Sequence, residues 1–239
     1  MKITVINGTE IHGVTDQLKN IFLESFRESA EIAEFYLPKD CPNFCAGCKT
    51  CFQDDENNCK DRAFTRPIEQ ALLEADLLVF TSPAYVGHAT GAMKTLLDHF
   101  GFRWMPHRPA TEMFSKRAIL LTQCLGAGAR STAKDIKDSL SWWGVSSIKI
   151  LSFRLMSEVF WEKLSAKKRA KMAAKLQRTA RRLQAECDKT PRVRLATKVR
   201  FYATRIIHKT IDKKYPTSPD SVYWNERGWM KKETPWKKK

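Results

Sequence analysis

The chain has 239 residues, of which 43% are hydrophobic and 28% charged, and its formal net charge is +16 at pH 7. This length allows one domain with a sizeable core plus an extension, and no apolar run approaches the ~20 residues that a membrane-spanning helix needs. The chain enters a strand directly, without the basic segment and apolar region of a signal peptide, so we expect a cytoplasmic protein with no transmembrane segment.

The positive charge is concentrated in the last third of the chain. Residues 1–153 hold 17 Lys and Arg against 18 Asp and Glu, a net charge of −1, whereas residues 154–239 hold 25 against 8, a net charge of +17. The charge therefore describes a tail and says little about the rest of the chain. Nucleic acid is not the partner that we expect.

Five segments predict the strands of a parallel α/β sheet, because helical segments alternate with them. Three are continuously apolar and two are of mixed polarity, in chain order 3–6, 31–37, 77–80, 118–122 and 148–153. Continuously apolar strands are buried on both faces, so the first, third and fourth strands should be central. This predicts the doubly wound strand order 2-1-3-4-5, with its switch point between the first and third strands.

Apolar residues at helical spacing predict the intervening helices. Thr15 can cap the first helix, a second covers residues 64–75, a third follows Gly91, and a fourth ends at Gly144. A long helix over residues 158–187 should present Phe160, Leu164, Met172, Leu176, Ala180 and Leu183 on its buried face.

Loops that could bind a ligand follow the three central strands. The first loop brings Gly8, Thr9, Gly13 and Thr15 to a helix N-terminus, where backbone N–H groups and the helix dipole suit a phosphate. The second is residues 82–87 (SPAYVG) and the third is residues 123–128 (QCLGAG). Each can also be an ordinary turn. The chain lacks G-x-x-x-x-G-K-[ST] and G-x-G-x-x-G motifs here, which disfavours nucleoside triphosphates and dinucleotides.

Five of the seven cysteines lie between Cys41 and Cys59, in an aperiodic insertion over residues 38–63. In a chain without a leader they suggest free thiols or metal ligands instead of disulfides. Cys45, Cys48, Cys51 and Cys59 follow a C-x2-C-x2-C-x7-C spacing, which suits an iron-sulfur cluster better than the two separated pairs typical of zinc. Cluster, zinc and free thiols stay open at this stage.

Four motifs together resemble the flavodoxin family of FMN-dependent NAD(P)H oxidoreductases and iron-sulfur flavoproteins: MKITVINGT, FCAGCKTC, SPAYVGHATGAMKTLLDH and RWMPHRP. The resemblance implies that the first loop holds the FMN phosphate and that the other two hold the flavin ring. The residues implied are Gly8, Thr9, Gly13, Thr15, Ser82, Pro83, Ala84, Tyr85, Val86, Gly87, Gln123, Cys124, Gly126 and Gly128. It also implies a 4Fe-4S cluster on Cys45, Cys48, Cys51 and Cys59. Thr9, Glu10 and Ile11 depart from the family's usual S-P-R, and we expect weaker FMN binding from this.

The implied activity is reduction of a small electron acceptor, such as a quinone, a nitro compound or a flavin, by NAD(P)H through bound FMN, with no conventional catalytic side chain. One alternative is an iron-sulfur flavoprotein that carries single electrons for a ferredoxin-like partner, and a second is a basic module that docks on an acidic surface. His107 or Arg108 could meet an anionic substrate or a nicotinamide phosphate; alternatively, Trp104 and Pro106 serve in packing and Arg108 is a surface ion-pair partner. We also expect a homo-oligomer.

We divide the chain into a flavodoxin-like FMN-binding domain, residues 1–187, and a basic C-terminal extension, residues 188–239. The extension predicts a helix with an apolar stripe of Leu195, Val199, Tyr202 and Ile206, followed by Trp224, Trp229 and Trp236 among lysines. Binding to an anionic membrane or to single-stranded nucleic acid is one interpretation. We expect instead that the extension folds back and buries its tryptophans, because soluble proteins rarely expose such patches.

Overall fold

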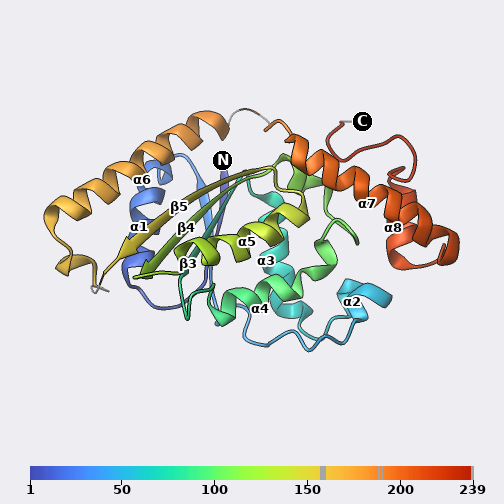
Figure 1. Ribbon diagram of the computed structural model, residues 1–239, viewed down its shortest axis with the longest axis horizontal. Coiled ribbons are helices and arrows are strands. Elements are labelled where there is room, and N and C mark those ends of the chain that lie inside the picture. Colours follow the sequence, from blue (N-terminus) through green and yellow to red (C-terminus); the bar gives the residue numbers. More distant parts are fainter. Residues whose placement is uncertain (157–159, 188, 190, 238–239) are drawn as a thin grey trace.

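The computed structural model describes residues 1–156, 160–187, 189 and 191–237, and at its centre is a five-stranded parallel sheet between two layers of helices (Figure 1). The strand order is β2-β1-β3-β4-β5, which confirms the predicted flavodoxin-like order. The strands are β1 (Lys2–Asn7), β2 (Glu31–Tyr36), β3 (Leu77–Pro83), β4 (Arg117–Leu125) and β5 (Ser147–Leu155).

Helices cover both faces of the sheet, and a further pair forms the extension. The α-helices are α1 (Val14–Leu23), α2 (Thr50–Gln53), α3 (Arg62–Glu74), α4 (Gly91–His99), α5 (Ala129–Trp143), α6 (Ala166–Cys187), α7 (Leu195–Lys214) and α8 (Pro219–Glu226). Short 3-10 turns are η1 (Glu24–Phe26), η2 (Glu56–Asn58), η3 (Gly101–Arg103), η4 (Thr111–Ser115) and η5 (Trp161–Lys163).

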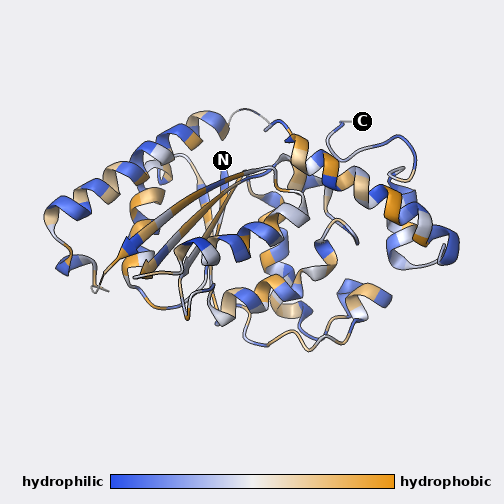
Figure 2. Ribbon diagram, viewed as in Figure 1, coloured by the Kyte–Doolittle hydropathy of each residue, from blue (hydrophilic) through white to orange (hydrophobic). Residues whose placement is uncertain are grey.

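Two apolar cores account for the polarity of the strands. Phe22 of α1 and Leu176 of α6 belong to the core on one face, whereas Leu96 of α4 and Ile136 of α5 belong to the core on the other. Every residue of β3 is buried and none of β2 is, which is why the first reads as a continuous apolar run and the second as an edge. Figure 2 shows the sheet mostly in the hydrophobic colours.

Two predicted helix details are wrong. The sixth helix begins at Ala166, not at residue 158, because residues 161–163 form a 3-10 turn, and residues 157–159 lie outside the described part of the chain. Phe160 is exposed, although Leu164 and the later predicted positions of the face are buried. Thr15 does not cap α1, since the helix begins one residue earlier with Gly13 at the cap position and no side-chain cap bond.

The extension folds back onto the first domain through aromatic packing. Trp224 and Trp229 are buried beside Phe114 of η4, and the Trp224 Nε1 donates to the His107 carbonyl oxygen at 2.7 Å. The expected burial of the tryptophans is therefore confirmed for these two, and Trp236 is half-buried against the same cluster.

Most of the predicted apolar stripe of α7 faces away from this cluster, although the Tyr202 ring centroid lies 6.0 Å from that of Trp236. Phe201 is the large apolar residue of α7 that is buried, together with the polar Thr197, Thr204 and His208, while Leu195 and its stripe partners are exposed. Among the described helices none combines the length and the hydropathy needed to cross a membrane.

Candidate functional site

A hollow of about 500 Å³ lies where the loops after β1, β3 and β4 meet, at the switch point of the sheet. This volume is within the range of small-molecule sites. Its lining comes from all three loops: Thr9, Ile11, Gly13, Val14, Thr15, Pro83, Ala84, Tyr85, Val86, Gly87, Gln123, Leu125 and Ala127.

Nine of the residues that the resemblance implied for the cofactor line this hollow, and five do not. The five are Gly8, Ser82, Cys124, Gly126 and Gly128. The sequence reasoning missed Ile11 and Val14, and it included Leu125 and Ala127 only as members of the loop 123–128. Ile11 is in the first loop and Leu125 is the last residue of β4, and both are exposed. A large apolar residue in a segment predicted as a loop was the available signal for both.

Gly8 and Ser82 join the first two loops behind the hollow. The Gly8 N–H donates to the Thr81 carbonyl oxygen at 2.8 Å, and a Cβ at Gly8 would lie 2.8 Å from the same oxygen. Thr90 donates its hydroxyl proton to the Gly8 carbonyl, and the Thr90 N–H donates to the Ser82 hydroxyl at 3.3 Å. These residues fix the loops relative to each other without facing the hollow.

Gly128 brings the third loop against the second. Its φ is +104°, in the region that favours glycine, and a Cβ there would lie 2.8 Å from the Gly87 Cα. Ser131 donates its hydroxyl proton to the Gly87 carbonyl, so the wall that Gly87 contributes is fastened to the N-terminus of α5.

The second loop ends in a tight turn with unusual backbone geometry. Tyr85 and His88 exchange N–H to carbonyl bonds of 2.9 and 3.1 Å, and the two residues between them, Val86 and Gly87, have φ of +50° and +81°. Positive φ at both central positions is the geometry of a type I′ turn. Val86 is 100% exposed, so a branched apolar side chain is held in the left-handed region at the rim of the hollow. Strain of this kind is common at ligand clamps.

Polar groups at two ends of the hollow are available to form hydrogen bonds with a ligand. The Gln123 Oε1 is buried with no hydrogen-bond partner among the described residues, and Gln123 lines the hollow. At the other end, α1 starts at Val14 without a side-chain cap, which leaves its first N–H groups for an anion. A ligand with an anionic end and a hydrogen-bond donor fits this arrangement.

Lys19 lies in the second turn of α1 and is 1% exposed. Its Nζ is 2.7 Å from Glu34 Oε2 and 2.9 Å from Asp16 Oδ1. Burial alone would lower the pKa of Lys19, but hydrogen bonds to Glu34, Tyr36 and Asp16 raise it above the usual range. Asp16, in the first turn of α1, and Glu34 of β2 therefore share a buried counter-charge, which limits the repulsion that Asp16 exerts on an anion at the N-terminus of α1.

The four predicted metal-ligand cysteines line one small hollow of about 50 Å³ in the insertion. Cys45 and Cys48 are exposed, and Cys51 and Cys59 are half-buried. Burial and the neighbouring cysteines raise the pKa of Cys51 to about 11, whereas a hydrogen bond with Thr50 lowers the pKa of Cys48. The spare Cys41 is buried in the core, which raises its pKa to about 11.

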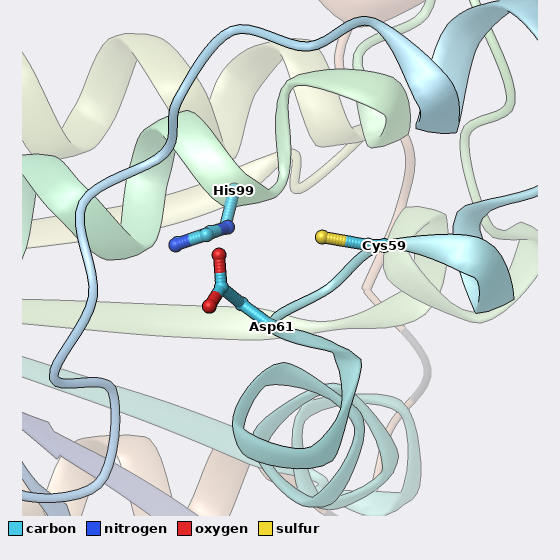
Figure 3. A group of neighbouring side chains, drawn as sticks. All are labelled: Cys59, Asp61 and His99. Atoms are coloured by element: carbon cyan, nitrogen blue, oxygen red, sulfur yellow. The ribbon is translucent and has the colours of Figure 1, made fainter.

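A tighter group of possible ligands lies beside this hollow. The ligand atoms of Cys59, Asp61 and His99 all lie within 4.8 Å of one another, and their side chains point toward a common centre (Figure 3). The His99 Nε2 is 2.8 Å from the Asn43 carbonyl oxygen, which can only accept, so Nε2 carries a proton and a neutral ring offers Nδ1. Sequence spacing alone missed Asp61 and His99.

Arg108 and His107 bind the extension instead of facing the hollow between the three loops. The Arg108 Nη1 is 2.6 Å from Asp220 Oδ1 and its Nη2 is 3.2 Å from Glu56 Oε2. Arg108 also donates to the Cys51 carbonyl oxygen, and His107 Nδ1 is 2.7 Å from Asp220 Oδ2. The geometry supports the ion-pair interpretation of Arg108, which is buried and not on the surface, and His107 shares its partner Asp220.

The model of the NADPH-dependent FMN reductase family matches residues 1–156 of this chain. The chain belongs to that family. An iron-sulfur flavoprotein of Archaeoglobus fulgidus is 30% identical over 99 residues, which is 41% of this chain and 48% of the relative. An iron-sulfur flavoprotein of Methanocaldococcus jannaschii is also 30% identical over 99 residues, 41% of this chain and 50% of the relative. The chain thus matches about half the length of these curated relatives.

Solved structures support the fold. An azoreductase from Bacillus anthracis superposes with a TM-score of 0.57 at 16% identity, covering 77% of this chain and 98% of that one. A putative quinone reductase from Klebsiella pneumoniae gives 0.53 at 18% identity, covering 80% and 86%. At these identities the likeness concerns architecture, and it agrees with the expected fold.

Proposed function

We propose that this protein is a flavin-dependent oxidoreductase that binds FMN in the hollow between the loops after β1, β3 and β4 and reduces a small acceptor with NAD(P)H. The observation that carries the proposal is the hollow itself, with an uncapped helix N-terminus at one end and the unpartnered Gln123 oxygen at the other. Membership of the FMN reductase family supports the choice of FMN over other anionic ligands.

The chain's own residues would bind and orient the cofactor. The first N–H groups of α1, with the hydroxyls of Thr9 and Thr15, would hold the phosphate. Gln123 would accept a hydrogen bond from the ring system, and the Tyr85 turn would close one side and limit the access of water. When bound, FMN supplies the acceptance and donation of hydride, so no side chain of the site needs to act as acid or base.

The binding test compares FMN with riboflavin, which lacks the phosphate. Titration of each flavin with apoprotein, followed by flavin fluorescence, should give saturable quenching for FMN at micromolar concentrations. Riboflavin should bind at least about tenfold more weakly, because a charge-assisted anion contact is worth roughly 1.5–3 kcal/mol. No saturable quenching by either flavin would remove the proposal, and equal affinities would remove the phosphate assignment.

The activity test follows NADPH and NADH oxidation by FMN-loaded protein with a quinone, a nitro compound or free flavin as acceptor. Turnover that requires added FMN in an iron-free preparation supports the oxidoreductase. FMN-loaded protein that oxidises neither nicotinamide with any of these acceptors would contradict it.

A second candidate function is that of an iron-sulfur flavoprotein that passes single electrons to a ferredoxin-like partner. The specific observation is that Cys45, Cys48, Cys51 and Cys59 border one hollow, in a chain with iron-sulfur flavoproteins among its relatives. Four thiols around one hollow fit a cluster whose corners each take one thiolate. The Cys59, Asp61 and His99 group would instead suit a single ion such as zinc.

Purification without oxygen separates these alternatives. A cluster predicts broad visible absorption and four irons per chain, both lost in Cys48→Ser and kept in Asp61→Asn. A single ion predicts the reverse, one metal per chain that depends on Asp61 and tolerates Cys48→Ser. Metal-free protein with full flavin activity would leave the cysteines as thiols and exclude the electron-carrier function.

A further inference from the structure

Helix α7 carries apolar side chains on both of its faces. One face is buried through Phe201, which packs on Phe114 with ring centroids 6.0 Å apart. Away from that face lie Leu195, Val199, Tyr202 and Ile206, which are 76%, 59%, 44% and 68% exposed; we call this set the outer face of α7. Tyr202 is at its edge, with its ring centroid 6.0 Å from that of Trp236. Three of the four are aliphatic side chains more than half exposed, where a water-facing helix normally carries polar residues.

Cations accompany this apolar face. α7 holds six Lys and Arg against one Asp, and the exposed Lys209 and Lys213 continue the line of the outer face toward the C-terminal end of the helix. α6 is more basic still, with eight Lys and Arg against one Glu, and it follows the same upper edge of the molecule as α7 in the view of Figure 1. Figure 2 shows the difference between them, since α6 is mainly blue whereas α7 has wide orange bands.

We infer that the outer face of α7 docks on the surface of an anionic lipid bilayer. The helix would lie in the plane of the interface, with Val199 and Ile206 among the first acyl carbons and Lys209 and Lys213 at the lipid phosphates. Apolar burial and attraction to anionic headgroups act together in helices of this type, and about 1 kcal/mol per cation is typical near such a surface.

The positive charge of α7 favours a lipid bilayer over a second copy of the chain as the partner of the outer face. Two copies joined through the outer faces would bring two helices of net charge +5 together, which like-charge repulsion disfavours. A linear stripe of four side chains also offers no pocket or anchor for a folded acidic partner, whereas lipid chains adapt to it without one. The inference does not depend on FMN, because the outer face shares no residue with the hollow between the three loops.

The experiment uses full-length protein in flotation with vesicles of phosphatidylcholine alone and of phosphatidylcholine with phosphatidylglycerol in equal amounts. The protein should float with the mixed vesicles only, and raising the salt should release most of it. Val199→Gln with Ile206→Gln leaves the charge unchanged and should weaken binding at least about tenfold through lost apolar burial. Lys209→Gln with Lys213→Gln leaves the stripe unchanged and should weaken it about thirtyfold.

Val222→Gln is the matched control, since Val222 is also an apolar side chain of the extension, 41% exposed but on α8. It should bind vesicles as the unchanged protein does. All variants alter exposed positions, and unchanged circular dichroism and flavin titration show that they fold.

Three results would overturn the inference. The first is no flotation with the mixed vesicles, and the second is flotation that Val199→Gln with Ile206→Gln leaves unchanged, which would reduce docking to charge alone. The third is a dimer in light scattering that this double variant dissociates while vesicles bind neither protein, which would make the outer face a contact between copies.

Discussion

Replacing Gly128 with alanine tests whether the close contact between the second and third loops shapes the flavin site. The added Cβ would lie 2.8 Å from the Gly87 Cα and 3.2 Å from the Ala84 Cβ, and both neighbours line the hollow. Alanine at φ +104° costs about 1–2 kcal/mol in backbone strain, and the forced separation of the loops adds about 1–3 kcal/mol. We expect a loss of about 2–5 kcal/mol in the free energy of unfolding.

Gly126→Ala provides the control, because Gly126 has φ of +76° but no atom within 4 Å of its Cβ position. It should lose only the strain, about 1–2 kcal/mol, and should keep its FMN affinity. Gly128→Ala should bind FMN at least about tenfold more weakly, equivalent to about 1.4 kcal/mol, because Gly87 must move. The assays are urea unfolding of the apoprotein and FMN fluorescence titration. Equal FMN affinities for the two variants would refute the reasoning.

Three further predictions concern charged groups. Asp220→Asn weakens the contacts with Arg108 at 2.6 Å and His107 at 2.7 Å, and should cost about 2 kcal/mol in urea unfolding; an unchanged midpoint would contradict a structural role for the pair. Burial lowers the pKa of His208, so the unfolded chain binds a proton near the ordinary value of 6.5 while the folded chain does not, and stability falls as the pH drops below that value. His208→Phe keeps a ring on Trp224 and should flatten this acid loss of melting temperature, and parallel curves would count against it. Lys19→Met leaves Asp16 and Glu34 without their cation and should lower the free energy of unfolding by about 2 kcal/mol. Because the pKa of Lys19 is raised, its contribution to stability is complete below the ordinary value of 10.5 and disappears only as the pH rises above the folded-state pKa. A loss of stability that varied between mildly acidic and neutral pH would point to another group.

The order of the sheet could be predicted because burial on both faces leaves a direct trace in the sequence. Every position of β3 is buried and none of β2 is, so the apolar run 77–80 and the mixed segment 31–37 placed the central and edge strands correctly. Glycines that precede helices located the loops of the hollow for a similar reason, since close approach of backbones requires them at Gly8 and Gly128.

The buried face of α7 could not be predicted, because apolar residues at helical spacing occur on more than one side of this helix. Leu195, Val199, Tyr202 and Ile206 form the more regular stripe, yet the large ring of Phe201 fits the aromatic cluster and decides the orientation. Local spacing also holds no information on partners far away in the chain, such as Arg108 and Asp220 or Cys59 and His99. The start of α6 was also predicted too early. Apolar residues keep a helical spacing through residues 161–163, which form a 3-10 turn, although α6 itself begins at Ala166.

The Arg108 guanidinium contacts the Cys51 carbonyl, Glu56 and Asp220. One side chain therefore connects the cysteine-bearing insertion with the C-terminal extension. Thermodynamic linkage makes such a connection reciprocal. A ligand that stabilises the folded conformation of one segment raises the free energy needed to detach the other segment from Arg108. Loading of the cysteines with metal should therefore slow protease cleavage within the extension. Removal of the extension should in turn weaken the retention of metal, so that each of these two segments reports on the state of the other.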